Sequence, residues 1–164
     1  STTDALTQLS NRHVLNAEIE KLCYDAERYN SSFCVMLIDV DNFKQINDTH
    51  GHMQGDDVIR EIVKLLKTHL RHTDIAARFG GDEFCVLLPH MPLGQAPEIA
   101  DKFRQRIETE TFETDNGERF TVTVSIGIAE YNSDLCEPKA LLALADEALY
   151  IAKEKGRNRV EIKG

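Results

Sequence analysis

Three carboxylates stand out by their position in the sequence. Asp39 follows the most apolar run of the chain, residues 33–38, at the end where a strand opens toward a ligand. Asp82 and Glu83 follow a pair of glycines between two further strand-like runs. Carboxylates that gather at one point repel one another unless a cation lies between them, and oxygen ligands favour Mg²⁺ or Mn²⁺. A pair of such ions would activate a hydroxyl group and stabilise a phosphoryl group under attack. An isolated Gly-Gly-Asp-Glu could equally be a soluble turn.

Groups that suit an anion accompany these carboxylates. Phe43 and Lys44 begin a short predicted helix just after the first carboxylate, so free backbone N–H groups face a potential anion there. Lys153 and Arg157 come at the end of the last predicted helix and add positive charge. The same two residues would also interact favourably with the C-terminal end of that helix dipole.

Asn47 and Asp56 offer an amide and a carboxylate, the pair of groups needed to read a guanine edge. Both residue types are also common in turns and at helix N-caps. Their spacing alone does not decide between these roles.

Hydrophobic periodicity predicts the elements that must position these side chains. The expected order is α-β-α-α-β-β-α-β-α-β, which favours an α/β (α+β) class with a mixed central sheet flanked by helices. The expected elements are a helix at 11–29, a strand at 33–38, a short helix with Phe43 and Ile46, a helix at 58–70, strands at 75–79 and 84–88, a helix at 96–107, a strand at 120–128, a helix from Pro138 to Gly156, and a strand at 160–162.

Three local features refine this prediction. Gly80 and Gly81 tolerate the positive φ angles of a tight turn and therefore predict a β-hairpin. Asp41 is well placed to cap the short helix that follows it. Gly51 and Gly55 are expected to bracket a turn before the next helix.

Size and charge exclude several classes of protein. The chain has 164 residues, 41% of them hydrophobic and 29% charged, which is ordinary for one globular domain. No apolar run approaches the ~18 residues of a membrane span. The net charge of −9 has the wrong sign for a nucleic-acid or anionic-membrane binder. The chain begins without methionine, and we expect residues 1–164 to be one domain of a longer protein.

The four cysteines bear on the compartment. Cys23, Cys34, Cys85 and Cys136 are scattered without a Cys-x-x-Cys pair, and two of them fall in strand-like runs. This pattern favours buried thiols in a reducing cytoplasm over a disulfide framework or a zinc site. The parent protein could still be attached to a membrane.

The segment from Arg78 to Phe84, Arg-Phe-Gly-Gly-Asp-Glu-Phe, resembles the signature of the GGDEF family, the diguanylate cyclases. The resemblance extends over essentially the whole chain. Gln8 and Ser10 depart from the usual Gly and the frequent Pro of the family, far from the proposed chemistry. The other matching segments are residues 4–12, 38–48, 51–56, 125–128, 145–153 and 156–158.

The resemblance implies a palm-like fold similar to nucleotidyl cyclase catalytic domains and some polymerases. It also implies a GTP-dependent nucleotidyltransferase in which each domain holds one GTP. Two GGDEF domains would meet in a transient homodimer and join two GTP into cyclic di-GMP, with release of two pyrophosphates. An upstream sensor domain, absent from this chain, would control that encounter.

The resemblance further implies roles for individual residues. Asp39 and the carbonyl of Val40 would bind metal, with two ions at each active site. Asp82 and Glu83 would share metal ligation and activation of the 3′-hydroxyl. The remaining roles are phosphate binding by Phe43 (backbone), Lys44, Lys153 and Arg157, guanine binding by Asn47 and Asp56, and close approach of the hairpin backbone to the nucleotide at Gly80 and Gly81.

Arg71 and Asp74 resemble the family's RxxD inhibitory site, at which cyclic di-GMP binds as product and arrests the enzyme. The alternative is an ordinary i,i+3 ion pair at a helix end, worth a few tenths of a kcal/mol. The spacing to the hairpin favours the inhibitory site.

Two other functions compete with an active, product-inhibited GTP cyclase. One is a regulatory module that binds GTP or cyclic di-GMP without turnover, which the complete set of Asp39, Asp82 and Glu83 disfavours. The other is a cyclase that uses ATP, which Asn47 and Asp56 disfavour.

Overall fold

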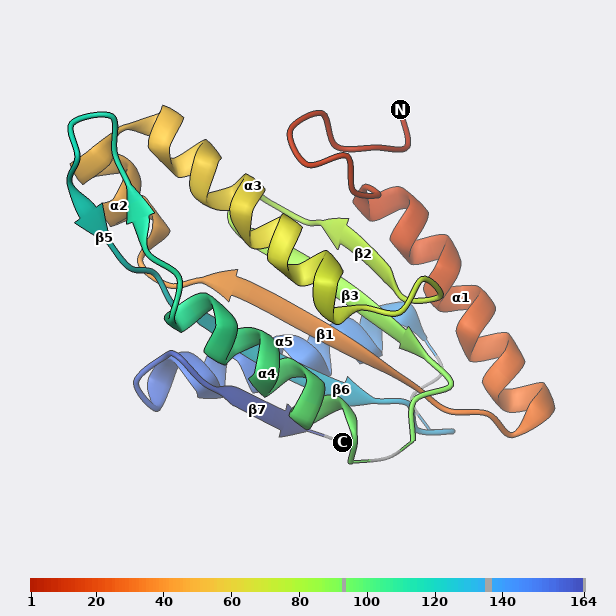
Figure 1. Cartoon of the computed structure of the whole chain (residues 1–164). Coiled ribbons are helices and arrows are strands. Elements are labelled where there is room, and N and C mark those ends of the chain that lie inside the picture. Colours follow the sequence, from red (N-terminus) through yellow and green to blue (C-terminus); the bar gives the residue numbers. More distant parts are fainter. Residues whose placement is uncertain (93, 135–136, 164) are drawn as a thin grey trace.

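The computed structural model describes residues 1–92, 94–134 and 137–163 (Figure 1). The helices in this part of the chain are α1 (Arg12–Tyr29), α2 (Phe43–His50), α3 (His52–His69), α4 (Ala96–Glu108) and α5 (Pro138–Glu154). The strands are β1 (Phe33–Val40), β2 (Ile75–Arg78), β3 (Glu83–Pro89), β4 (Phe112–Glu113), β5 (Arg119–Phe120), β6 (Val124–Glu130) and β7 (Val160–Lys163).

Five of the strands form one mixed sheet in the order β2-β3-β1-β6-β7. Strand β1 pairs antiparallel with β3 and with β6, whereas β6 and β7 are parallel. Every residue of β1 is buried, as expected for a central strand covered on both faces. The mixed sheet with flanking helices confirms the predicted fold class.

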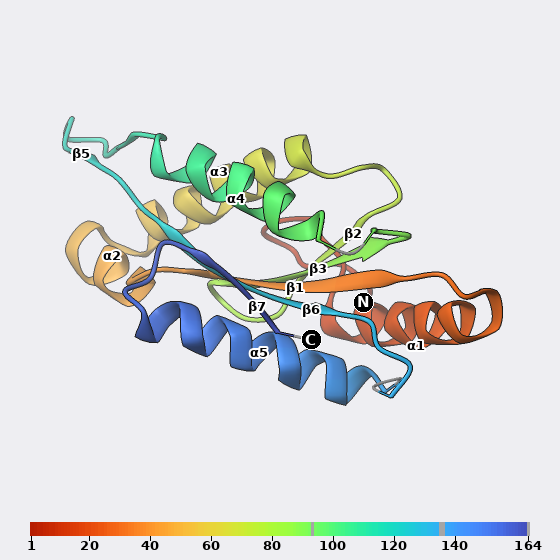
Figure 2. The same cartoon turned by 90° about the horizontal axis from the view of Figure 1, so that it is seen from below.

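Helices cover both faces of this sheet (Figure 2): α3 and α4 lie on one side, α1 and α5 on the other. The alternation along β1 matches this arrangement, because Met36 and Ile38 belong to the core under α3 and α4, whereas Val35 and Leu37 belong to the core under α1 and α5. Helix α5 packs very closely on β6. A Cβ at Gly127 would lie 2.2 Å from the backbone nitrogen of Leu149, so only glycine allows this contact.

The strand predicted at residues 120–128 is in fact two strands with different partners. Strand β5 pairs with β4 in a small separate sheet, which the sequence did not predict, and β6 begins at Val124 opposite Val40. The Thr/Val alternation continues through residues 121–123, so periodicity could not reveal the change of partner.

The turn predicted between Gly51 and Gly55 is also shorter than expected. Gly51 lies at the turn with φ of 90°, but Gly55 is a buried residue of α3. Because Gly55 has no side chain, Asn47 of α2 can pack directly against it.

Three of the cysteines, Cys23, Cys34 and Cys85, are buried as predicted, and Cys136 lies outside the described residues. Burial raises the pKa of the Cys34 thiol to about 12, which leaves it protonated and unreactive at neutral pH. Among the described residues, no helix is both long and apolar enough to cross a membrane.

Candidate active site

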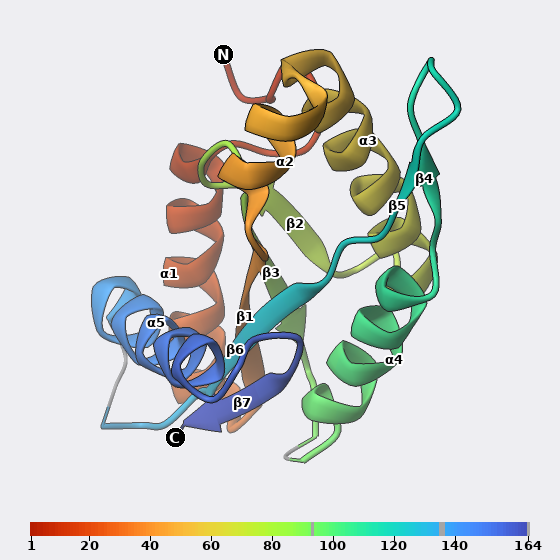
Figure 3. The same ribbon diagram turned by 90° about the vertical axis from the view of Figure 1, so that its left-hand side faces the viewer.

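The segments that carry the predicted carboxylates meet at one end of the sheet, where the β2–β3 loop lies beside the end of β1 and the start of α2 (Figure 3). The antiparallel register places Asp39 opposite Glu83. The backbone nitrogen of Val40 donates to the carbonyl of Asp82 at 3.1 Å. Because Asp39 lies two residues after Leu37, its side chain and that of its register partner Glu83 lie on the α1/α5 face of the sheet.

Asp39 is the buried acid of this site, with 8% of its surface exposed. Its Oδ2 forms an ion pair with the ammonium of Lys153, whereas its Oδ1 is buried and has no hydrogen-bond partner among the described residues. Burial raises the pKa of Asp39 to about 6; the Lys153 ammonium opposes this rise, and the nearby charge of Asp82 adds to it. Burial would lower the pKa of Lys153, but the hydrogen bond to Asp39 outweighs it and raises that pKa.

The unpartnered Oδ1 of Asp39 is the atom of this site that suits a divalent cation. In the described part of the chain, no three His, Cys, Asp or Glu side chains are gathered closely enough to hold a metal by themselves. The segments of Asp39, Asp82 and Glu83 converge as predicted, and the ammonium of Lys153 pairs with Asp39. A buried carboxylate oxygen without a donor, next to a second carboxylate at Asp82, is the type of ligand that Mg²⁺ or Mn²⁺ accepts.

The backbone conformation of the hairpin tip does not require its two glycines. Neither Gly80 nor Gly81 has a left-handed φ, so the predicted conformational reason is wrong. A Cβ at Gly81 would meet nothing within 4 Å, and one at Gly80 would make only an ordinary contact with Glu83. The absence of side chains therefore leaves the outer surface of the tip open instead of relieving a contact inside the protein.

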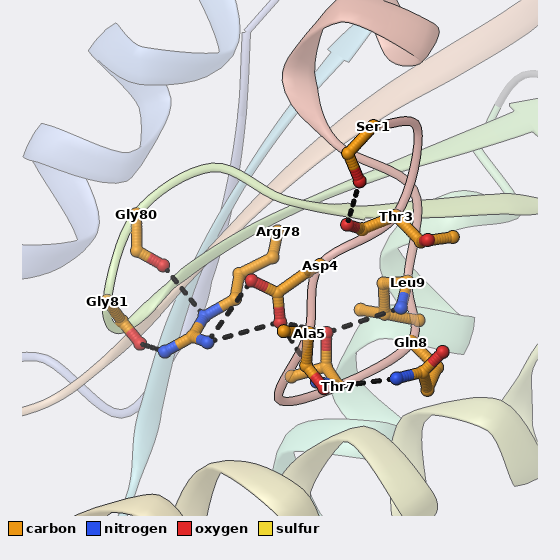
Figure 4. Close-up of polar contacts among 10 residues, drawn as sticks. All are labelled: Ser1, Thr3, Asp4, Ala5, Thr7, Gln8, Leu9, Arg78, Gly80 and Gly81. Carbon is orange, nitrogen blue, oxygen red and sulfur yellow. Dashed lines mark hydrogen bonds and ion pairs between the residues drawn. The ribbon is translucent and has the colours of Figure 1, made fainter.

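The side chain of Arg78 binds the backbone of this tip (Figure 4). Its guanidinium donates to the carbonyl oxygens of Gly80 at 3.1 Å and Gly81 at 2.7 Å. It also forms an ion pair with Asp4, and the Asp4 carboxylate accepts hydrogen bonds from the backbone and the hydroxyl of Thr7. Burial would raise the pKa of Asp4, but these hydrogen bonds outweigh it and lower that pKa. The opening segment thus fixes the position of the hairpin, a contact that the sequence patterns did not predict.

Helix α2 begins without a side-chain cap. Asn42 occupies the N-cap position with φ of 56°, and its side chain makes no capping hydrogen bond, so the N–H groups of the first turn suit an anion. Lys44 is exposed in this first turn. Asp41 does not cap the helix as predicted, because its carboxylate is buried and faces the sheet.

The Asp41 carboxylate instead joins three parts of the site. It accepts hydrogen bonds from the hydroxyls of Thr123 and Ser125, both at 2.6 Å, and from the backbone nitrogen of Asn158 at 3.1 Å. Asn158 follows Arg157, and both have left-handed backbones with φ of 48° and 65°. Asp41 therefore holds the turn that carries Arg157, an exposed residue beyond the end of α5, close to the end of β1. Only the proximity of residues far apart in the sequence reveals this role.

Helices α2 and α3 carry the two residues predicted to bind guanine, Asn47 and Asp56. The Oδ1 of Asn47 is buried and has no hydrogen-bond partner among the described residues. The side chain lies directly over Gly55, where a Cβ would come within 1.8 Å of that oxygen. Asp56 is exposed in α3, directly after Gly55. An unpartnered amide oxygen beside a carboxylate suits the N–H donors of a guanine ring.

We expect Gly55→Ala to weaken guanine nucleotide binding about fivefold with little change in melting temperature. The new methyl group displaces the flexible end of Asn47 instead of backbone, and the lost hydrogen bond is worth roughly 1 kcal/mol. Titration with a fluorescent GTP analogue measures the affinity, with Asn47→Ala and the double variant as controls. Additive losses in the double variant would show that the two residues act separately.

Comparisons with known proteins show the family of this chain. The family described as "Diguanylate cyclase, GGDEF domain" matches residues 1–159. The chain belongs to the GGDEF family. It is 38% identical to diguanylate cyclase A of Treponema denticola over 165 residues, which cover 99% of this chain and 44% of that protein. It is 39% identical to diguanylate cyclase DosC of Escherichia coli over 159 residues, covering 97% of this chain and 34% of that protein.

Solved GGDEF domains have the same fold. The GGDEF domain of DgcB from Caulobacter crescentus in complex with c-di-GMP superimposes with a TM-score of 0.94 at 33% identity, covering 98% of this chain and 92% of that one. A GGDEF-only form of PA1120 from Pseudomonas aeruginosa gives 0.93 at 36% identity, with coverages of 99% and 94%. The chain thus spans a third to less than half of these two curated relatives, but nearly all of the solved domains.

Arg71 and Asp74 of this GGDEF domain lie apart from the carboxylates, at the opposite end of β2. Arg71 donates to both oxygens of Asp74, with the shortest contact 2.7 Å, and to the carbonyl of Pro89. The Asp74 side chain is only 2% exposed, whereas that of Arg71 is 44% exposed. The pair borders a hollow of about 500 Å³ that Lys67 and His72 also line. The ion pair is present, and binding of product there stays a prediction.

Proposed function

We propose that this domain condenses two GTP molecules into cyclic di-GMP and releases two pyrophosphates. The observation that carries the proposal is the buried, unpartnered Oδ1 of Asp39 at the end of β1, beside the open tip of the β2–β3 hairpin. A buried polar atom without a partner is costly unless a ligand completes it. Membership of the GGDEF family names the reaction that such a site performs.

One GTP would lie across the end of the sheet. Its phosphates would meet the backbone N–H groups at Phe43 together with Lys44 and Arg157, all of them exposed or half-buried. Its guanine would meet Asn47 and Asp56 between α2 and α3. The resulting orientation places the ribose and the α-phosphate next to the glycine tip, where no side chain interferes.

Asp39, the carbonyl of Val40, Asp82 and Glu83 would hold two Mg²⁺ or Mn²⁺ ions. When bound, these ions stabilise the charge that develops on the attacked phosphate and make the 3′-hydroxyl more acidic. Lys153, which forms an ion pair with Asp39, would also contribute its ammonium to the binding of the phosphates. Asp82 and Glu83, on the tip and its first strand residue, would accept the proton that the 3′-hydroxyl loses.

The stoichiometry requires a second copy of the domain. One site holds one GTP, yet the product has two new bonds, each formed between a 3′-hydroxyl and an α-phosphate. Two domains must therefore face each other antiparallel, each presenting its nucleotide to the other. We propose that this homodimer is transient, and that the chain is the catalytic domain of a longer cytoplasmic protein whose sensor domain controls the encounter.

Incubation with GTP and Mg²⁺, followed by chromatography of the nucleotides, tests the proposal. We expect cyclic di-GMP from GTP and no cyclic product from ATP, because Asn47 and Asp56 match the donors of guanine. Binding of GTP without any product would instead indicate a regulatory module. Equal turnover of ATP would contradict the assignment of the guanine site.

We expect Arg71→Ala to weaken the binding of cyclic di-GMP roughly ten- to a hundredfold while GTP binding is unchanged. The loss corresponds to one charge-assisted contact to a phosphate or base. Calorimetry with both nucleotides measures it. Arg60→Ala is the control for loss of an arginine from an ordinary i,i+3 pair, which Arg60 forms with Asp57 on the surface of α3. Unchanged affinity for cyclic di-GMP in Arg71→Ala would leave the motif as an ion pair alone.

A further inference from the structure

The turn that joins α5 to β7 carries Arg157, and its backbone is unusual. Gly156, Arg157 and Asn158 are three consecutive residues with positive φ angles of 114°, 65° and 48°. Glycine and asparagine tolerate this region, whereas an arginine there is strained because its Cβ crowds the following carbonyl oxygen. Such a segment keeps one conformation only where the surrounding structure fixes it. The position of Arg157, which the proposed function assigns to the phosphates, therefore depends on the contacts that hold this turn.

Backbone hydrogen bonds attach this turn to its neighbours. The backbone nitrogen of Arg157 donates at 2.9 Å to a carbonyl in the last turn of α5. On the other side of the turn, the backbone nitrogen of Ile126 in β6 donates to the carbonyl of Arg159, also at 2.9 Å. Between these two anchors, the backbone nitrogen of Asn158 donates to the carboxylate of Asp41 at 3.1 Å. These bonds hold the main chain and leave the Asn158 side chain for a further element.

The side chain of Asn158 is held by α4, which lies on the opposite face of the sheet from α5 (Figure 2). Its amide oxygen accepts a hydrogen bond from the guanidinium of Arg104 at 2.9 Å, and its amide nitrogen donates to the carboxylate of Glu108. Arg104 and Glu108 lie one helical turn apart, with their charged groups 3.7 Å from each other. Both ends of the amide therefore bind one pair of charged side chains on the same helix.

Arg104 is itself fixed by its own helix. Its side chain is mostly buried, and its Nε donates at 2.7 Å to the carboxylate of Asp101, one turn earlier in α4. That hydrogen bond lowers the pKa of Asp101, so the carboxylate stays ionised and keeps the guanidinium in place at neutral pH. The contact to Asn158 is thus a charge-assisted hydrogen bond from a donor whose position is already set, the kind of bond that contributes most to geometry.

We propose that Arg104 and Glu108 are positioning residues, which hold the turn through the Asn158 side chain in the conformation that presents Arg157 to the phosphates of GTP. The inference rests on the proposed function, because that function assigns Arg157 to the phosphates. Helix α4 would thereby contribute to nucleotide binding without touching the nucleotide. A purely structural role, attachment of α4 to the edge of the sheet, would not distinguish ligands that carry phosphates from ligands that lack them.

Affinities for guanosine and for a GTP analogue with a methylene group between its α- and β-phosphates, measured with Mg²⁺, test this role. The analogue cannot release pyrophosphate, so it binds without reacting. Arg157→Ala should weaken its binding about ten- to a hundredfold, the range of one charge-assisted contact. Arg104→Ala keeps that charge but loosens the turn, so we expect a loss of roughly three- to tenfold, with guanosine bound as by the parent. In the Arg157→Ala background, Arg104→Ala should cause no further loss.

Two further variants separate positioning from stability. Asn158→Gly removes the contacts to α4 but keeps a residue that adopts a left-handed backbone, so it should reproduce the loss even if Arg104→Ala melts at a lower temperature. Arg106→Ala removes another paired arginine from the exposed side of α4 and should bind both ligands like the parent.

Three results would overturn the positioning role: parent affinity for the analogue in Arg104→Ala or Asn158→Gly, an equal loss for guanosine, or a full additional loss in the Arg157→Ala background. A parent chain that does not bind the analogue would overturn both the positioning role and the proposed function. A parent chain that binds the analogue but forms no cyclic di-GMP from GTP would refute the proposed function alone, because the binding measurements decide the positioning role by themselves.

Discussion

Replacing Asp39 by Asn should reduce formation of the cyclic dinucleotide at least about a hundredfold while the fold remains intact. The substitution removes a buried carboxylate whose Oδ1 has no hydrogen-bond partner among the described residues. Mutation of a residue that hydrogen-bonds to a metal ligand typically lowers metal affinity or activity about ten- to a hundredfold. Removal of a ligand itself should lower activity further. Asp82→Ala and Glu83→Ala should be similarly inactive. Chromatography of the products after incubation with GTP and Mg²⁺ measures the loss.

The same variants should melt no lower than the parent in the absence of metal. The pKa of Asp39 is raised from 3.8 to about 6, which means that the folded protein disfavours the ionised carboxylate at neutral pH. Asn has the same shape without that charge, so it relieves the burial penalty, although it also releases Lys153. Asp57→Asn, an exposed acid of α3, is the control for an ordinary charge change. Normal product formation by any of the three site variants would remove that residue from the mechanism.

Specific activity should rise with the concentration of this chain, and a dimeric coiled coil fused ahead of Ser1 should raise it strongly. The reaction needs two domains, each with its own GTP, so their encounter limits the rate when nothing holds them together. The net charge of −9 adds a weak repulsion at physiological salt, where the Debye length is about 8 Å. Rates measured over a hundredfold range of enzyme concentration, with and without the fusion, test this prediction.

A fused coiled coil that cannot dimerise, with polar residues at its core positions, is the control for the fusion. It should leave the concentration dependence unchanged. Sedimentation that shows a stable dimer at micromolar concentration, together with a constant specific activity, would contradict encounter control.

Much of this fold could be predicted from hydrophobic periodicity. The run at residues 33–38 is apolar at every position, and it became the central strand β1. The apolar spacing of residues 11–29 became α1, with Asn11 at its N-cap. These predictions succeeded because burial on one or both faces leaves a direct trace in the residue pattern.

Contacts between residues far apart in the sequence could not be predicted from the residue pattern. Asp41 has the residue type and position of a helix cap, yet donors more than eighty positions away determine its orientation. Gly55 looks like a turn residue, but it is required by the packing of Asn47 across two helices.

The site residues were named from the family resemblance, and the structure brings their segments together at one end of the sheet. Asp39 and Glu83 face each other through the register of β1 and β3. The resemblance did not indicate that Lys153 pairs with Asp39, because it assigns Lys153 to the phosphates.

The ratio of pyrophosphate to cyclic product tests the central claim most directly. With the chain held as a dimer by the fused coiled coil, GTP and Mg²⁺ should yield two pyrophosphates for each cyclic di-GMP, and Asp39→Asn in the same fusion should yield neither. One pyrophosphate for each cyclic mononucleotide, or GTP recovered unchanged from a chain that binds it, would contradict the account.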